Sequence, residues 1–265
     1  MLEIKIKRCA TLGEIFAMRY LRNVIFNLMR RSKILYSILN PLIHCAEKCI
    51  RNNSRNWKAR NDNFQKYAAD RLRSFKECLD KNNLKFWLTS GTLLGAYREK
   101  RLLTHDIDID VAMFISDMEH AKQVLTANGF VLEHEFGVVG EGVSELSFCC
   151  KDVKIDIFFV EVKNEKFVHN IFFKGNDSNR NDDFCVIEMF LPQTGFIEYE
   201  FLGEKYLIPE KTTEYLTANY GPNFMIPDKY WNYMKDIPSA VYHSLDSKRG
   251  FHITHGNVDT EEQKL

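Results

Sequence analysis

Three aspartates alternate with branched aliphatic residues in the stretch DIDIDV at residues 106–111. In a β-strand this spacing puts Asp106, Asp108 and Asp110 on one face and the aliphatic side chains on the other. Neighbouring like charges repel and aspartate is a poor strand former, so such a face requires a compensating cation. Carboxylate oxygens are the ligands that Mg2+ or Mn2+ prefers, without Cys or His. A solvated edge strand is the competing explanation.

A fourth acid, Asp156, stands alone in the otherwise apolar stretch VKIDIFFV at residues 153–160. Burying an unpaired carboxylate is unfavourable, so Asp156 needs a cation or hydrogen-bond donors beside it. We therefore expect Asp108, Asp110 and Asp156 to be the catalytic and metal-binding residues, with Asp106 as an outer ligand only.

A short turn of small residues precedes the acidic stretch. Residues 86–89 are typical of a short buried strand and residues 93–99 of a helix. A turn between the two offers free backbone N–H groups and the positive end of a helix, which suit a phosphate group. We expect phosphate binding here through four residues: Ser90, Gly91, Thr92 and Arg98.

These motifs resemble a known family. The order of Gly-Thr turn, helix, Asp-x-Asp strand and later lone-Asp strand resembles the nucleotidyltransferase fold, and GTLLGAYR followed by DIDID resembles its LicD and fukutin-related branch. The segment YLIPEKTTEYLTANYG at residues 206–221 looks like the end of that family's core, so the resemblance spans roughly residues 65–235. One departure is the chain's Leu-Thr-His-Asp-Ile-Asp-Ile-Asp, where the family commonly has Pro-Trp-Asp-Asp-Asp-Ile-Asp.

The resemblance implies an α+β fold, with a nucleotidyltransferase-like mixed β-sheet flanked by helices. It also implies a transferase that moves a phosphorylated small alcohol, phosphocholine above all, from a CDP-linked donor to a lipopolysaccharide or related cell-surface glycan. Asp108 and Asp110 would hold Mg2+ (or Mn2+) against the donor diphosphate, and Asp156 would orient or deprotonate the acceptor hydroxyl. Two alternatives are an NTP-dependent nucleotidyltransferase acting on a small molecule or sugar, and a non-catalytic scaffold.

The zero net charge hides a division of the chain. Residues 1–60 carry 13 Lys and Arg against three Glu, a net +10, and the remaining residues carry 23 against 33, a net −10. We predict a basic amphipathic helical extension at 1–60, a catalytic domain at 61–240 and a polar, flexible tail at 241–265. The polar stretch at residues 51–63 is the expected boundary.

Apolar residues recur at helical spacing between basic ones in residues 11–43. This helix either lies on an anionic membrane surface, close to a glycolipid acceptor, or packs on the core or on a second subunit. The sequence shows no apolar run long enough to span a membrane, no signal peptide and no nucleic-acid-binding motif. We expect a cytoplasmic protein, peripheral on the inner face of the membrane, with no nucleic-acid partner.

Other patterns predict the supporting elements. We expect helices at residues 64–79, at 116–129 with Ser116 as the cap, and from Thr212 or Thr213 to Gly221, with strands at 130–136, 143–150 and 153–160. Seven cysteines without a Cys-x-x-Cys pair indicate reduced thiols. Aromatic residues between 220 and 233 either form a cage for a quaternary ammonium or pack as core and rim.

Overall fold

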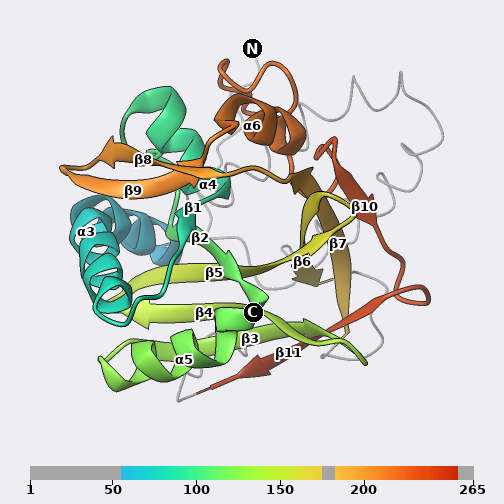
Figure 1. Cartoon of the computed structure of the whole chain (residues 1–265), viewed down its shortest axis with the longest axis horizontal. Helices are drawn as coiled ribbons and strands as arrows, with labels where there is room; N and C mark the ends of the chain where they lie inside the picture. The colour runs from blue at the N-terminus through green and yellow to red at the C-terminus, as the bar shows by residue number, and fades with distance from the viewer. Residues whose placement is uncertain (1–54, 175–182, 256–265) are drawn as a thin grey trace, which may run out of the picture. The chain divides into compact units, whose positions relative to one another are not determined.

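The computed structural model describes residues 55–174 and 183–255, drawn in colour in Figure 1. The basic extension predicted at residues 1–60 lies outside the described residues up to residue 54. So does the membrane contact predicted through residues 11–43.

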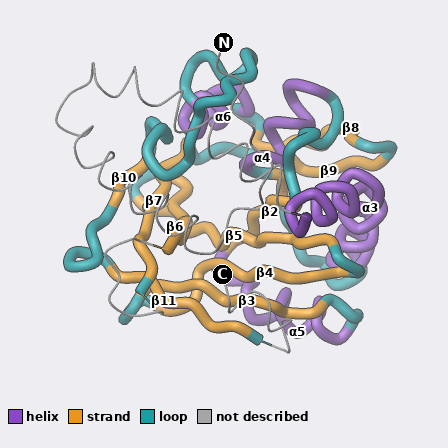
Figure 2. The backbone as a smooth tube through the Cα atoms, turned by 180° about the vertical axis from the view of Figure 1, so that it is seen from behind, coloured by secondary structure: helices purple, strands orange, loops and turns teal. Residues whose placement is uncertain are grey.

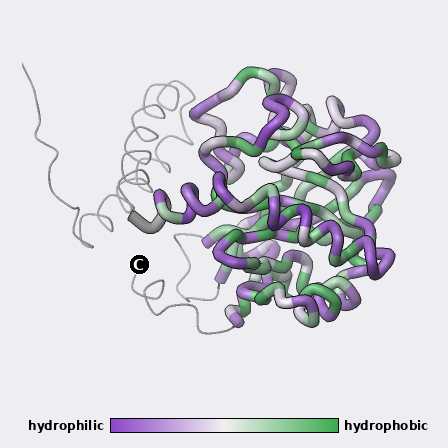
Figure 3. The backbone as a smooth tube through the Cα atoms, turned by 90° about the vertical axis from the view of Figure 1, so that its left-hand side faces the viewer, coloured by the Kyte–Doolittle hydropathy of each residue, from purple (hydrophilic) through white to green (hydrophobic). Residues whose placement is uncertain are grey.

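The first described element is the long helix α3 (Arg55–Asp80). Phe64, Ala68, Leu72 and Phe75 recur at helical spacing along α3 and are fully buried, which fixes the helix on the sheet. The helix facing the viewer in Figure 3 alternates between hydrophilic and hydrophobic residues accordingly. The helix predicted at 64–79 is confirmed, and it begins earlier than predicted, at Arg55. The polar residues 55–63 form the first turns of α3.

One mixed sheet forms the centre of the described chain. Its order is β10-β7-β11-β3-β4-β5-β2-β1-β9-β8, and β6 pairs with both β5 and β7. The strands β2 and β5 are parallel, as are β1 and β9, whereas the other pairs are antiparallel. The strands are β1 (Trp87–Leu88), β2 (Asp108–Phe114), β3 (Val131–Val138), β4 (Gly142–Cys150), β5 (Val153–Lys163), β6 (Lys166–Lys174), β7 (Phe184–Pro192), β8 (Phe196–Phe201), β9 (Glu204–Pro209), β10 (Ala240–Tyr242) and β11 (Arg249–Thr254).

Few helices accompany this sheet. They are α3, α4 (Ser90–Leu94), which continues into a π-helical turn (Gly95–Glu99), α5 (Met118–Ala127), which follows a short 3-10 turn, and α6 (Thr212–Tyr220). Figure 2 shows the same helices and strands from the opposite side. The predicted α+β class with a mixed sheet is confirmed. The predicted caps are shifted by one or more residues, since Asp117 rather than Ser116 precedes α5 and Lys211 precedes α6.

The central strands have two unlike faces. Ile109, Val111, Ile155 and Ile157 are fully buried on the face that α3 covers. The alternate residues of the same strands lie on the other face, which includes the acids. Near the start of the two strands, this alternation places Ile109 and Ile155 on one face and the acids on the other.

Residues 240–254 differ from the flexible tail predicted at 241–265. Ala240–Tyr242 forms β10 on β7, and Arg249–Thr254 forms β11, which lies between β3 and β7. Phe251 packs over Gly137, where an added Cβ would lie 2.5 Å from the Phe251 ring. This part of the chain therefore completes the sheet, and residues 256–265 lie outside the described part.

Two further findings concern the described residues. None of their helices is long and apolar enough to cross a membrane. No disulfide bond joins the cysteines of these described residues, Cys78, Cys149, Cys150 and Cys185.

His169 in β6 is buried without a hydrogen-bond partner for either ring nitrogen in the described structure, and its ring packs 5.4 Å from that of Phe158. Burial lowers the pKa of His169 from 6.5 to about 4. The unfolded chain therefore binds a proton between pH 6.5 and pH 4 that the folded chain does not, so stability falls as the pH falls through this range.

We expect the wild type to lose roughly 2 kcal/mol of unfolding free energy at pH 5 relative to pH 8 through this histidine. His169→Leu removes this part of the pH dependence. Urea unfolding of both proteins at the two pH values measures it, with exposed His120→Leu as the control. Identical pH slopes for wild type and His169→Leu would contradict the assignment.

Candidate active site

The predicted ligands meet through the pairing of β2 with β5. In this parallel pair Asp110 stands opposite Asp156, and Asp108 stands opposite Lys154. Because Ile109 and Ile155 pair on the buried face, Asp108, Asp110 and Asp156 all share the other face. The structure thus brings these three predicted residues together on adjacent strands.

The carboxylate of Asp156 is held on both oxygens. Ser147 of β4 stands opposite Asp156, and its hydroxyl donates a short hydrogen bond to Oδ1. The ammonium of Lys154 lies 2.9 Å from Oδ2. Asp156 is buried, and these two donors meet the requirement of a carboxylate in an apolar strand.

The turn before α4 fixes Asp110. The N–H of Gly91 donates to Oδ2 of Asp110 at 2.9 Å, and the N–H of Asp110 donates to the Thr92 hydroxyl at 2.9 Å. Ser90, which precedes them, adopts a left-handed backbone conformation with φ of 44°. The turn predicted to bind phosphate therefore holds an acidic side chain in place, through two of its predicted residues.

Gly91 also marks where two carboxylates converge. A Cβ added at Gly91 would lie 3.0 Å from Oδ2 of Asp106 and 3.1 Å from Oδ2 of Asp110. Oδ2 of Asp106 is buried and has no hydrogen-bond partner within the described part of the chain. Asp106 thus belongs to the acidic cluster, which we define as Asp106, Asp108, Asp110 and Asp156.

The acidic cluster is short of positive charge. Burial, followed by repulsion from Asp108, raises the pKa of Asp106 to about 7. Burial and the charge of Asp156 raise the pKa of Asp108, and burial and the charge of Asp108 raise that of Asp110 well above its usual range. Raised carboxyl pKa values in one patch are typical of a site that binds a cation.

Arg98 lies at the edge of this cluster. Its guanidinium donates to Oε1 of Glu99 at 2.9 Å and to the carbonyl of Phe224 at 3.1 Å. Its charge also lowers the pKa of Asp106, against the larger opposing effects. Arg98 therefore lies near the acids, and two of its N–H groups have protein acceptors.

Three residues of this face were not predicted from the sequence: Lys154, Ser147 and Glu145. Lys154 precedes Asp156 by two positions, so period-two spacing alone assigns it to the acidic face. Glu145 and Ser147 lie on β4, and only strand pairing brings them beside β5. Glu145 is buried with Oε2 unpartnered in the described structure, and burial with the nearby Asp156 raises its pKa well above the usual range.

The donor set suits a hard divalent cation. Within residues 55–174 and 183–255, no three Asp, Glu, His or Cys side chains already form a closed set of metal ligands. The unpartnered oxygen of Asp106 and the mutual repulsion of the acids nevertheless fit Mg2+ or Mn2+, because oxygen ligands of this kind gain most from such an ion. Asp156 is the exception, since both of its oxygens have partners in this arrangement.

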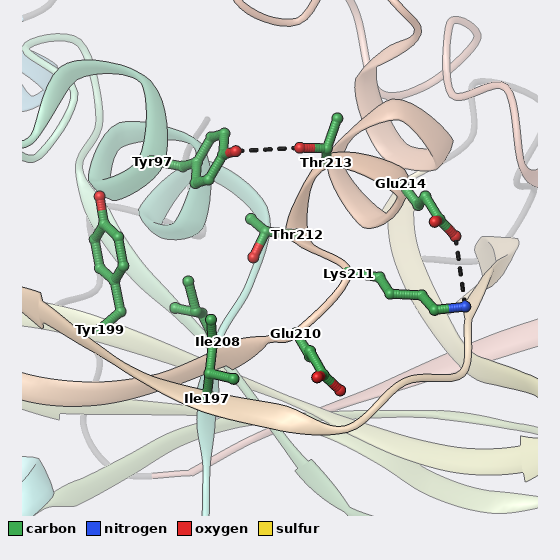
Figure 4. A pocket seen from close by; sticks show the side chains of 9 residues that line it. All are labelled: Tyr97, Ile197, Tyr199, Ile208, Glu210, Lys211, Thr212, Thr213 and Glu214. Atoms are coloured by element: carbon green, nitrogen blue, oxygen red, sulfur yellow. Dashed lines mark hydrogen bonds and ion pairs between the residues drawn. The ribbon is translucent and has the colours of Figure 1, made fainter.

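A hollow of about 260 Å³ lies elsewhere, between the π-helical turn, β8, β9 and the start of α6 (Figure 4). At this hollow the hydroxyls of Tyr97 and Thr213 form a hydrogen bond of 3.1 Å, and the ammonium of Lys211 lies 4.0 Å from Oε2 of Glu214. No residue of the acidic cluster lines this hollow. We place the candidate site at the cluster because its carboxylates, unlike the hollow, have an unmet need for a ligand.

The chain is similar to several known proteins. The model of the family described as LicD/FKTN/FKRP, nucleotidyltransferase domain, matches residues 83–211. The ribitol-5-phosphate transferase FKTN of Macaca fascicularis is 33% identical over 181 residues, which cover 67% of this chain and 37% of that protein. The human FKTN is 32% identical over the same length. The human ribitol 5-phosphate transferase FKRP is 23% identical over 164 residues, 58% of this chain and 31% of that protein.

The aligned part of this chain thus spans little more than a third of its FKTN relatives. Among solved structures, the lincosamide antibiotic adenylyltransferase LnuA, bound to lincomycin, has a TM-score of 0.36 at 14% identity. The match covers 58% of this chain and 93% of that one.

Proposed function

Residues 83–211 belong to the LicD/FKTN/FKRP nucleotidyltransferase-domain family, and from this we propose that the chain transfers a phosphorylated small alcohol from a CDP-linked donor to a hydroxyl of a glycan. The observation that carries the proposal is the register of β2 and β5, which sets Asp110 beside Asp156 with Asp108 on the same face. A patch of carboxylates in this arrangement suits a reaction in which phosphate charge must be neutralised.

The relatives named ribitol-5-phosphate transferases favour an alditol phosphate as the transferred group. Phosphocholine, expected from the sequence, is the second candidate. Tyr220 and Trp231 support it, because their rings lie 4.6 Å apart and aromatic faces attract a quaternary ammonium. Burial, followed by the charge of Asp110, raises the pKa of Tyr220.

Each residue has a distinct role in the proposed reaction. Asp108 and Asp110 would bind the divalent ion, and the turn from Ser90 to Thr92 keeps Asp110 in position. Asp156 would complete the set of ligands, and it orients the acceptor hydroxyl and accepts its proton as the phosphorus–oxygen bond forms. The bond between the phosphoryl group and CMP breaks at the same centre, and CMP leaves. The bound ion would supply neutralisation of the charge that develops on the phosphate oxygens.

A donor screen tests this proposal directly. The full chain is incubated with Mg2+, a glycan acceptor and one of CDP-ribitol, CDP-glycerol, CDP-choline or CDP-ethanolamine, and CMP is quantified. We expect CMP from one CDP-linked donor and no pyrophosphate from any NTP. Pyrophosphate from an NTP would instead establish the alternative, a nucleotidyltransferase acting on a small molecule or sugar.

The Thr92 hydroxyl offers a further test of the site. Thr92→Val keeps the shape of this buried side chain but leaves the part-buried N–H of Asp110 without its acceptor. We expect a loss of about 1–3 kcal/mol of stability and a tenfold or larger loss of CMP release, since Asp110 loses an anchor. Thr92→Ser retains the hydroxyl and is the matched control. Equal behaviour of the two variants in melting and turnover assays would exclude this anchoring role.

A further inference from the structure

Lys154 is a cation inside the face that carries the acidic cluster. It lies on β5 opposite Asp108 of β2, two positions before Asp156. Its ammonium is 2.9 Å from Oδ2 of Asp156, and its side chain is 24% exposed. The lysine is therefore held as a counter-ion to the acids.

Asp156 differs from the other acids in what its oxygens contact. Ser147 occupies Oδ1 and Lys154 occupies Oδ2, whereas Asp106 has a buried oxygen with no partner in the described structure. A metal ion that used Asp156 as a ligand would need the oxygen that Lys154 now contacts. A metal ion and the Lys154 ammonium would repel each other strongly if both contacted Oδ2, so only one of them occupies this oxygen at a time.

The released lysine would have a partner in the donor. A lysine ammonium on its flexible stem binds phosphate oxygens as a point charge, and its partial exposure leaves it a path away from Asp156. Ser147 stays on the other oxygen, so Asp156 keeps its orientation when Lys154 departs. The same residue can thus neutralise the acids before the ion binds and the donor phosphates afterwards.

We propose that Lys154 is an exchangeable counter-ion: a divalent metal ion displaces its ammonium from Asp156, and the freed ammonium then binds the phosphates of the nucleotide donor. The inference rests on the proposed function, because it assumes the metal and the CDP-linked donor. It explains why the acids stand together without forming a closed ligand set in the described chain.

The first experiment measures two affinities by calorimetry on the full chain. In Lys154→Met we expect Mn2+ and Mg2+ to bind about tenfold more tightly, because the competing cation is gone. With Mn2+ present, CDP should bind about tenfold more weakly, because a phosphate ligand is lost. Lys163→Met is the matched control. Lys163 lies on the same strand but is 51% exposed and paired with Glu161, so both affinities should stay at the wild-type values.

In Lys154→Met the metal affinity should rise while the CDP affinity falls, and these opposite changes distinguish the proposed role from a structural one. General damage to the site would weaken both ligands. A nearby spectator cation would affect the metal alone. Unchanged metal affinity in Lys154→Met overturns the exchange, and unchanged CDP affinity overturns the phosphate contact.

A second experiment uses the wild type, so it stands even where Lys154→Met fails to fold. Reductive methylation with peptide mass spectrometry reports the accessibility of each lysine. We expect the labelling of Lys154 to rise at least threefold on addition of Mn2+ alone and to fall again when CDP is added, with Lys163 constant as the internal reference. An extent of Lys154 labelling that does not change when Mn2+ is added would overturn the proposal.

The outcomes also separate this inference from the proposed function. A chain that shows the opposite affinity shifts but releases CMP from no CDP-linked donor retains the exchangeable lysine and refutes the transferase. A chain that releases CMP while Lys154→Met matches the wild type in both affinities retains the transferase and refutes the exchange.

Discussion

Asp110→Asn is expected to reduce transfer by at least about a thousandfold while the protein remains folded. The amide oxygen of asparagine can still accept the hydrogen bond from Gly91, so the turn before α4 keeps its contact. What is lost is the negative charge that binds the divalent ion. Asp108→Asn should behave in the same way, since Asp108 lies two positions away on the same face.

The stability of these variants should move in the opposite direction to their activity. Burial, followed by repulsion from neighbouring acids, raises the pKa values of Asp108 and Asp110, so their charged forms are unfavourable in the folded chain. Removing one charge relieves this repulsion, so the melting temperature of the metal-free variant should equal or exceed that of the wild type. CMP release and thermal melting in EDTA measure the two effects, and the exposed Asp62→Asn is the control. Full activity in either variant would reject the metal assignment.

Gly95→Ala is expected to cost about 3 kcal/mol of unfolding free energy, although alanine normally favours a helix. Gly95 has helical dihedral angles, with φ of −61° and ψ of −47°, so its backbone does not require glycine. Glycine is required here because residues 101–103 pass close to this position. A Cβ at this position would lie 2.6 Å from the carbonyl oxygen of Arg101 and 3.2 Å from the nitrogen of Leu103.

The consequence of that clash extends to the acids. Residues 101–103 lead directly to Asp106, and the side chains of Gln65 and Asn61 on α3 donate hydrogen bonds to the carbonyls of residues 103, 104 and 106. Displacing the segment should therefore also lower CMP release, by about tenfold or more. Urea unfolding and turnover assays measure both effects, and Gly129→Ala is the comparison. Its Cβ would meet nothing within 4 Å, so only the strain of a positive φ, about 1 kcal/mol, should appear. A Gly95→Ala protein no less stable than Gly129→Ala would contradict the packing argument.

The sequence predicted the parts of this structure that depend on local spacing. Period-two alternation placed Asp108 and Asp110 on one face, and the lone acid of VKIDIFFV identified Asp156. Helical spacing from Phe64 to Leu79 predicted most of α3. These patterns are readable because each repeats the geometry of one element, whatever that element later packs against.

Pairing between distant segments could not be read in this way. Ser147 reaches Asp156 only because β4 lies beside β5, and His252 reaches His134 only because β11 lies beside β3. The stretch at residues 51–63 has the composition of a linker, yet Asn61 is anchored by carbonyls of residues 104 and 106, which a composition argument cannot foresee. Nothing in the sequence indicated that the N–H of Gly91 donates a hydrogen bond to the carboxylate of Asp110.

The place of β11 has a consequence for how the chain acquires its structure. This strand is the last of the sheet in sequence, yet it bridges β3 and β7, which flank it on either side. During synthesis on the ribosome, the half of the sheet that bears Asp108 and Asp156 can form early. The edges of β3 and β7 that pair with β11 stay unpaired until β11 has been synthesised. Until residues 249–254 emerge, those two edges are open to pairing with other chains, so premature termination just before this strand should produce aggregates rather than a smaller enzyme.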